Sequence, residues 1–114
     1  MELDKKTKLI TDSLEEKKGA DIIVMDAPEG LLLDKFVVCS ANNTQHLKTL
    51  FENLKKTLSD NNIDIYGAHG PAEKESGWLV LDTSDIIIHI MTSEKREYYT
   101  LEELWKESFG EKSE

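Results

Sequence analysis

The sequence GWLVLDTSDIIIHIM, residues 77–91, decides the fold. Its two apolar runs are rich in β-branched residues and flank Thr83 and Ser84, which is typical of two strands joined by a tight turn. A two-residue turn at these positions would set Trp78 directly opposite His89, and Asp82 opposite Asp85. Alternation along the strands then predicts two different faces. The aliphatic face, which is expected to be core, is made by Leu79, Leu81, Ile86, Ile88 and Ile90. The mixed face is made by Trp78, Val80, Asp82, Asp85, Ile87, His89 and Met91. The mixed face is expected either to pack under a helix or to be offered to a partner.

The rest of the chain divides into short segments of helical or strand character. Apolar residues at helical spacing predict helices over 2–18, ended by Gly19, and over 44–58, capped by Asn42 or Asn43. A capping box at Thr100 predicts a third helix over 100–109. The remaining segments are expected to be strands at 21–26, 32–41 and 63–66, an exposed loop at 67–77 and a polar connection at 92–99.

This order of elements predicts one α/β domain with a mixed, roughly five-stranded sheet flanked by helices. The domain is expected to cover residues 1–109, and residues 110–114 are expected to form a frayed tail. The chain has 114 residues, which is enough for a single core of modest size.

The net charge of the chain indicates which class of partner to expect. The chain has 23 acidic and 14 basic residues, a net charge of −9, which repels phosphate backbones. We therefore expect no direct binding of nucleic acid and, instead, a basic protein partner. No apolar run approaches the ~20 residues that a membrane helix needs, and the charged N-terminus carries no signal core. The expected location is the cytoplasm.

Residues capable of catalysis are few and scattered. The only cysteine, Cys39, lies in an apolar run and is expected to be a buried hydrophobe rather than a nucleophile. The three histidines show no metal-ligand spacing, so no metal and no cofactor are expected. The alternative is an enzyme with a nucleotidyltransferase-like site that would use Asp82, Asp85 and His89.

The chain resembles the ribosomal silencing factor family, also called the iojap-like family, over about residues 3–105. The resemblance rests on the segments 21–26, 34–38, 78–82 and 85–90, and on Arg96, Tyr98, Tyr99, Leu101, Glu102, Leu104 and Trp105. In the hairpin turn, where the family commonly has glycine, this chain has Ser84. The resemblance implies a mixed-sheet fold related to the nucleotidyltransferases but without their catalytic aspartate pair.

The resemblance also implies a function and a partner. Family members bind large ribosomal subunit protein fourteen on the face that meets the small subunit, which blocks subunit joining and lowers translation; some assist large-subunit biogenesis. The leading hypothesis is therefore a non-enzymatic translation repressor. Its partner-binding residues are expected to be Trp78 as an apolar anchor, Asp82 as an acceptor, and His89, Arg96 and Tyr98 beside them. A homodimer in which Trp78 meets its symmetry mate is a third hypothesis.

Overall fold

The computed structural model describes residues 2–30, 33–69 and 77–98. Along the chain the elements are α1 (Leu3–Glu16), β1 (Ala20–Asp26), β2 (Lys35–Ala41), α2 (Thr44–Asp60), β3 (Gly67–His69), β4 (Trp78–Asp82), β5 (Ile86–Thr92) and α3 (Ser93–Tyr98). They form one α/β domain with a mixed sheet, as the sequence predicts. None of the helices in the described ranges is long and apolar enough to cross a membrane.

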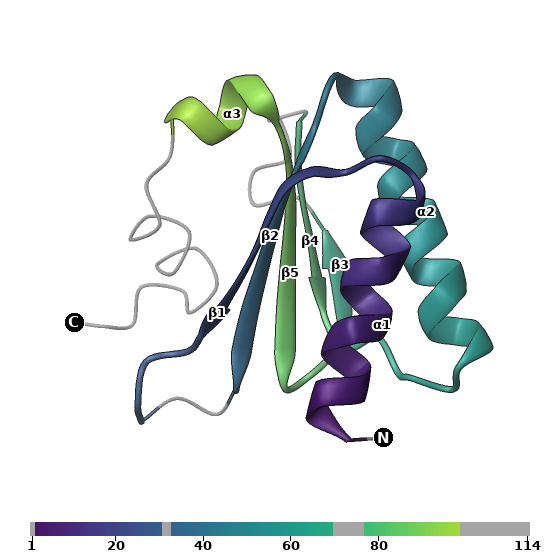
Figure 1. Ribbon diagram of the computed structural model, residues 1–114, viewed down its shortest axis with the longest axis vertical. Helices are drawn as coiled ribbons and strands as arrows, with labels where there is room; N and C mark the ends of the chain where they lie inside the picture. Colours follow the sequence, from purple (N-terminus) through teal and green to yellow (C-terminus); the bar gives the residue numbers. More distant parts are fainter. Residues whose placement is uncertain (1, 31–32, 70–76, 99–114) are drawn as a thin grey trace.

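The sheet has the strand order β1-β2-β5-β4-β3. Four of these strands are five to seven residues long, whereas β3 adds only three residues at one edge. The central strands β2 and β5 are parallel, and the other neighbouring pairs are antiparallel. Strand β5, the last of the described strands in chain order, therefore lies in the middle of the sheet (Figure 1).

Both long helices lie side by side on one face of the sheet, and α3 lies beyond the end of β5 on the other side (Figure 1). The helix-covered face packs an aliphatic cluster in which α1, α2 and the strands all take part. Its fully buried members include Ile10, Leu14, Leu50, Leu54, Leu58, Val37, Leu81, Ile86, Ile88 and Ile90. A second, smaller cluster occupies the opposite face and contains Phe36, Val38, Trp78, Val80, Ile87 and Met91.

Both long helices end in the same backbone motif. The N–H of Gly19 donates to the carbonyl of Leu14 at 2.8 Å and the N–H of Lys18 to that of Glu15 at 2.9 Å, while Lys18 has φ +65°. This is a Schellman motif, in which the residue with positive φ is usually glycine. Helix α1 thus ends at Glu16, two residues before the predicted end, and Lys18 rather than Gly19 has the positive φ. Gly19 is needed for packing instead. A Cβ there would lie 2.5 Å from the Sγ of Cys39.

The hairpin has the predicted faces but a different register. Trp78 is paired with Met91 and Val80 with His89, so the predicted pairing of Trp78 with His89 is wrong by two residues. The reason is that the N–H and hydroxyl of Thr83 both donate to the carbonyl of Ile86, at 3.0 and 2.7 Å, which moves the turn to Ser84 and Asp85. A shift of two residues leaves the side chains within the strands on their predicted faces. Asp85, predicted to lie on the mixed face, instead lies in the turn and pairs with Lys6 of α1.

Several further predictions need correction or fall outside the described ranges. The segment 63–66 forms no strand. Strand β3 lies just after it, at residues predicted to form a loop. Strand β2 begins at Lys35 rather than at 32, and the expected polar connection contains α3. The predicted helix 100–109 and tail 110–114 lie outside the residues that the structure describes.

Candidate functional site

A hydrogen-bonded tryptophan–histidine pair occupies the sheet face opposite the long helices. The indole Nε1 of Trp78 donates to Nδ1 of His89 at 3.0 Å, and the ring of Phe36 stacks on the imidazole with centroids 6.1 Å apart. Trp78 is 3% exposed and His89 is fully buried. An imidazole that accepts at Nδ1 carries its proton on Nε2 when neutral, so this contact fixes the tautomer. The pair lies beneath the surface of this face.

The hairpin turn is held by Asp82. Its half-buried carboxylate accepts the N–H of Ser84 at 2.8 Å, and its carbonyl accepts the N–H of Tyr66 at 2.8 Å. Ser84 has φ +83°, and the N–H of Asp85 donates to the carbonyl of Thr83 at 3.1 Å, the hydrogen bond of a γ-turn centred on Ser84, a conformation that glycine adopts most easily. The carboxylate of Asp82 therefore stabilises an unfavourable backbone conformation in addition to presenting charge at the tip.

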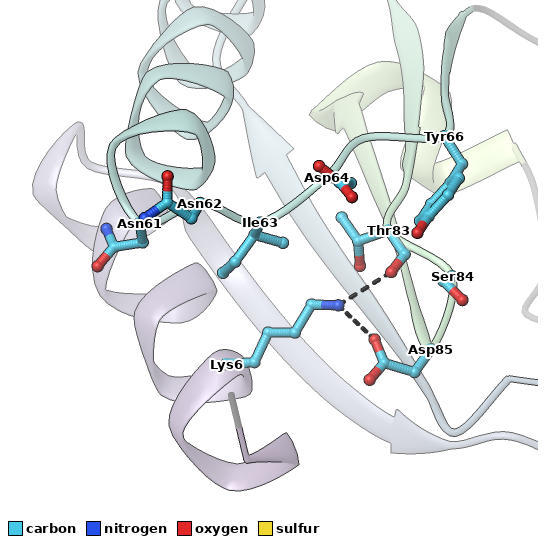
Figure 2. A pocket seen from close by; sticks show the side chains of 9 residues that line it. All are labelled: Lys6, Asn61, Asn62, Ile63, Asp64, Tyr66, Thr83, Ser84 and Asp85. Atoms are coloured by element: carbon cyan, nitrogen blue, oxygen red, sulfur yellow. Dashed lines mark hydrogen bonds and ion pairs between the residues drawn. The ribbon is translucent and has the colours of Figure 1, made fainter.

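A cleft of about 510 Å³ lies between this turn and the segment 61–66 (Figure 2). Lys6 of α1 crosses its floor, donates to the carbonyl of Thr83 at 2.9 Å and forms an ion pair with Asp85. Sequence reasoning missed this lysine. The signal was its place three residues after Leu3 and four before Ile10, on the apolar stripe of a helix where a charged residue must find a partner.

At the other end of the hairpin, Arg96 connects α3 to β2. Its Nη1 donates to Oγ of the buried Ser40 at 2.6 Å. Tyr98 is the last residue of α3, and its side chain lies outside the described part of the structure. Arg96 and Tyr98 therefore flank the end of the sheet from which the Trp78 strand starts.

The predicted site residues are spread along the hairpin rather than gathered at one point. Trp78 and His89 touch each other, and Arg96 lies beyond the end of β5. Asp82 is at the turn, four residues along β4 from Trp78, which corresponds to about 13 Å at the rise of a β-strand. Any single partner of all these residues would have to cover the length of the hairpin.

The described residues contain neither a cluster of metal ligands nor a reactive thiol. Within them, no group of three or more His, Cys, Asp or Glu side chains could hold a metal ion. Cys39 is buried, as predicted, and burial raises the pKa of its thiol to about 11. The thiol therefore stays protonated at neutral pH, which is the unreactive form.

The fold and these contacts define a small acidic α/β domain in which both long helices of the described residues cover the same face of a mixed sheet (Figure 1). Comparison with known proteins identifies its family. The model of the family described as "ribosomal silencing factor during starvation" matches residues 1–114. The chain belongs to the ribosomal silencing factor family.

Individual relatives agree with this assignment. The ribosomal silencing factor of Chromobacterium violaceum is 33% identical over 107 residues, which cover 92% of this chain and 85% of the relative. A crystal structure of a protein from the same bacterium superimposes with a TM-score of 0.82 at 30% identity, covering 92% of this chain and 87% of that one. A mouse protein named mitochondrial assembly of ribosomal large subunit protein 1 is 32% identical over 104 residues, 85% of this chain but 43% of the mouse protein.

Proposed function

We propose that this chain is a ribosomal silencing factor that binds the large ribosomal subunit through its fourteenth protein and prevents the small subunit from joining. The observation that carries the proposal is the match of the family model along the whole chain. The proposed repression is steric and non-enzymatic, acts in the cytoplasm and needs no cofactor. The fold would be a nucleotidyltransferase-like one without the catalytic aspartates.

The acidic character of the protein supports a basic protein as the partner. A net charge of −9 favours encounter with the positively charged surface that ribosomal proteins commonly present, and it disfavours direct contact with RNA. The proposed binding surface runs along the hairpin from Asp82 at the turn to Arg96 and Tyr98 in α3. Trp78 and His89 would shape this surface from beneath, since both are buried.

A second role, in assembly of the large subunit, is supported by the name of the mouse relative. Assembly and silencing would use the same contact, because both require occupation of one surface of the large subunit. The difference would lie in the particle that is bound, an immature subunit in one case and a finished one in the other.

The enzymatic alternative has less support from the geometry. Asp85 is engaged by Lys6 from the helix-covered side, whereas His89 is engaged by Trp78 on the opposite face of the sheet. Asp82 is occupied by its own turn. Titration calorimetry with ATP and magnesium is expected to give no heat of binding, and a saturable heat would contradict the proposal.

A homodimer built around Trp78 is likewise less favoured, because the indole is already buried within one chain. Light scattering is therefore expected to give the same mass for the wild type and for Trp78→Phe. A mass that halves in the variant would support the dimer instead.

The decisive test is sedimentation of purified ribosomal subunits with and without the protein. We expect the protein to sediment with the large subunit and to reduce the peak of joined ribosomes. Asp82→Asn keeps an oxygen to accept the Ser84 N–H but removes the charge, so it should weaken binding several-fold. The matched control is Glu52→Gln, the same loss of charge on the exposed surface of α2. Unchanged joining at a large excess of wild-type protein would contradict the proposed function.

A further inference from the structure

Strand β1 forms an open edge of the sheet. It pairs with β2 on one side, and no strand within the described ranges pairs with its other side. Ile23 and Val24 are each 40% exposed, and the described residues contain only one other exposed large hydrophobic side chain, Tyr66. Successive strand residues point to opposite faces, so the edge is apolar on both.

The two edges of this sheet differ in their protection. Strand β3, at the far edge, is only three residues long, and very short strands are a common way to blunt an edge. Strand β1 has seven residues, ADIIVMD, with neither proline nor lysine to block pairing. Its register with β2 is irregular between Ala20 and Ile23, so the regular part of the edge runs from Ile23 to Asp26.

The charges beside this edge are acidic. Asp21 and Asp26 flank the apolar pair, and Asp26 forms an ion pair with Lys35 at 2.6 Å. An antiparallel pairing of β1 with a second copy, centred between Ile23 and Val24, would set Asp21 of one chain opposite Asp26 of the other. It would also join two bodies that each carry a net charge of −9. Self-pairing is therefore disfavoured, and a basic strand suits this edge better.

We propose that the β1 edge binds an extended segment of a basic protein by strand addition. The backbone of the incoming segment would pair with Ile23–Asp26, its apolar side chains would cover Ile23 and Val24, and a lysine or arginine would lie near Asp21. This surface is on a different strand from the hairpin and α3, so the inference goes beyond the proposed function and stands or falls separately from it.

The test is titration of the ¹⁵N-labelled full chain with a synthetic seven-residue peptide that has three valines at its centre and two lysines at each end, so that apolar side chains face both Ile23 and Val24. A peptide with glutamate in place of lysine is the matched probe. Amide NMR signals of residues 23–26 are expected to shift with the lysine peptide only. Asp21→Asn keeps the tolerance for φ +48° that this position requires, and it should raise the dissociation constant about three-fold, the effect of one exposed charge pair. Glu52→Gln, on α2, should leave it unchanged.

A second variant separates binding at the edge from a general charge effect. Val24→Lys introduces the kind of residue that blocks natural edges, at an exposed position, and should abolish the shifts while the thermal unfolding midpoint stays close to that of the wild type. Three outcomes would overturn the proposal: equal binding of both peptides, shifts confined to β4, β5 or α3, or β1 signals that change with protein concentration alone. The last would identify a second copy as the occupant.

Discussion

The two faces of this sheet are held by different kinds of interaction. The helix-covered face is aliphatic and depends on burial, with many side chains contributing similar amounts. The opposite face also buries apolar side chains, but it places an indole, an imidazole and a phenyl ring together and adds a buried hydrogen bond and ring stacking to that burial. Burial tolerates exchange of one hydrophobe for another, whereas a directional contact needs particular atoms. The difference predicts separate mutational signatures for the two faces.

The largest expected effect comes from two neighbours on β5 that point to opposite faces. Ile88 is fully buried under the helices, while Ile87 is 7% exposed on the other face. Truncation of a buried isoleucine to alanine costs about 2–5 kcal/mol, more where the site cannot collapse. We expect Ile88→Ala to lie near the upper end of this range and Ile87→Ala near the lower end, measured by urea unfolding. Equal losses would mean that both faces are packed alike.

The next effect concerns the buried pair on the mixed face. Trp78→Phe removes the indole N–H that His89 accepts and should lower the free energy of unfolding by about 1–3 kcal/mol. His89→Leu and the double variant complete a thermodynamic cycle. A coupling energy of about 1 kcal/mol between the two sites is expected. Additive losses would show that the hydrogen bond contributes nothing beyond packing.

A smaller effect is expected from the lysine below the cleft. Lys6→Met keeps the buried stem but removes the ammonium that binds Thr83 and Asp85. Since the Asp85 side chain is 36% exposed and partly screened by solvent, we expect a loss of about 1–2 kcal/mol. Lys8→Met, two residues along α1, breaks only an exposed pair with Asp12 and should cost less than about 0.5 kcal/mol. Similar losses for both variants would show that the contacts of Lys6 contribute no more to stability than an exposed ion pair does.

The smallest expected effect is a gain in stability at the hairpin turn between β4 and β5. Ser84→Gly relieves the positive φ and should stabilise the protein by about 0.5 kcal/mol. The same substitution in a helix, Ser59→Gly in α2, should instead destabilise by a similar amount. Thermal unfolding of both variants gives the comparison, and a loss at Ser84 would show that its side chain matters more than its backbone.

The sequence predicts the helix-covered face well because its signal is periodic. Leu47, Leu50, Leu54 and Leu58 recur at helical spacing and are all buried. The hairpin faces were also predictable, since alternation survives a shift of two residues. The pairing within the hairpin was not, because it depends on whether the hydroxyl of Thr83 binds Ile86.

The edge strand β3 and the contacts of Lys6 could not be predicted, because they depend on residues that are distant in the sequence. The alternating segment 63–66 has the sequence pattern of a strand but forms none, although its last residue, Tyr66, donates its N–H to the carbonyl of Asp82. Gly67–His69, with little apolar character, pairs with β4 instead. Strand formation requires a partner edge, and the sequence does not state which edge is free. The bonds of Lys6 to the hairpin turn span 77 and 79 residues of sequence, so no local pattern predicts them. The sequence shows only that a charged residue lies on the apolar stripe of a helix.

The strand order has a consequence for synthesis of the chain. Of the strands that the structure describes, β5 is the last to leave the ribosome, yet it joins β2 to β4 and thereby unites the two halves of the sheet. A nascent chain halted before Ile86 would have two separate strand pairs, each with an edge that only β5 can fill. Termination or proteolysis in this region would thus abolish the whole domain rather than trim it, and the unfinished intermediate would be the species most exposed to aggregation and to quality control.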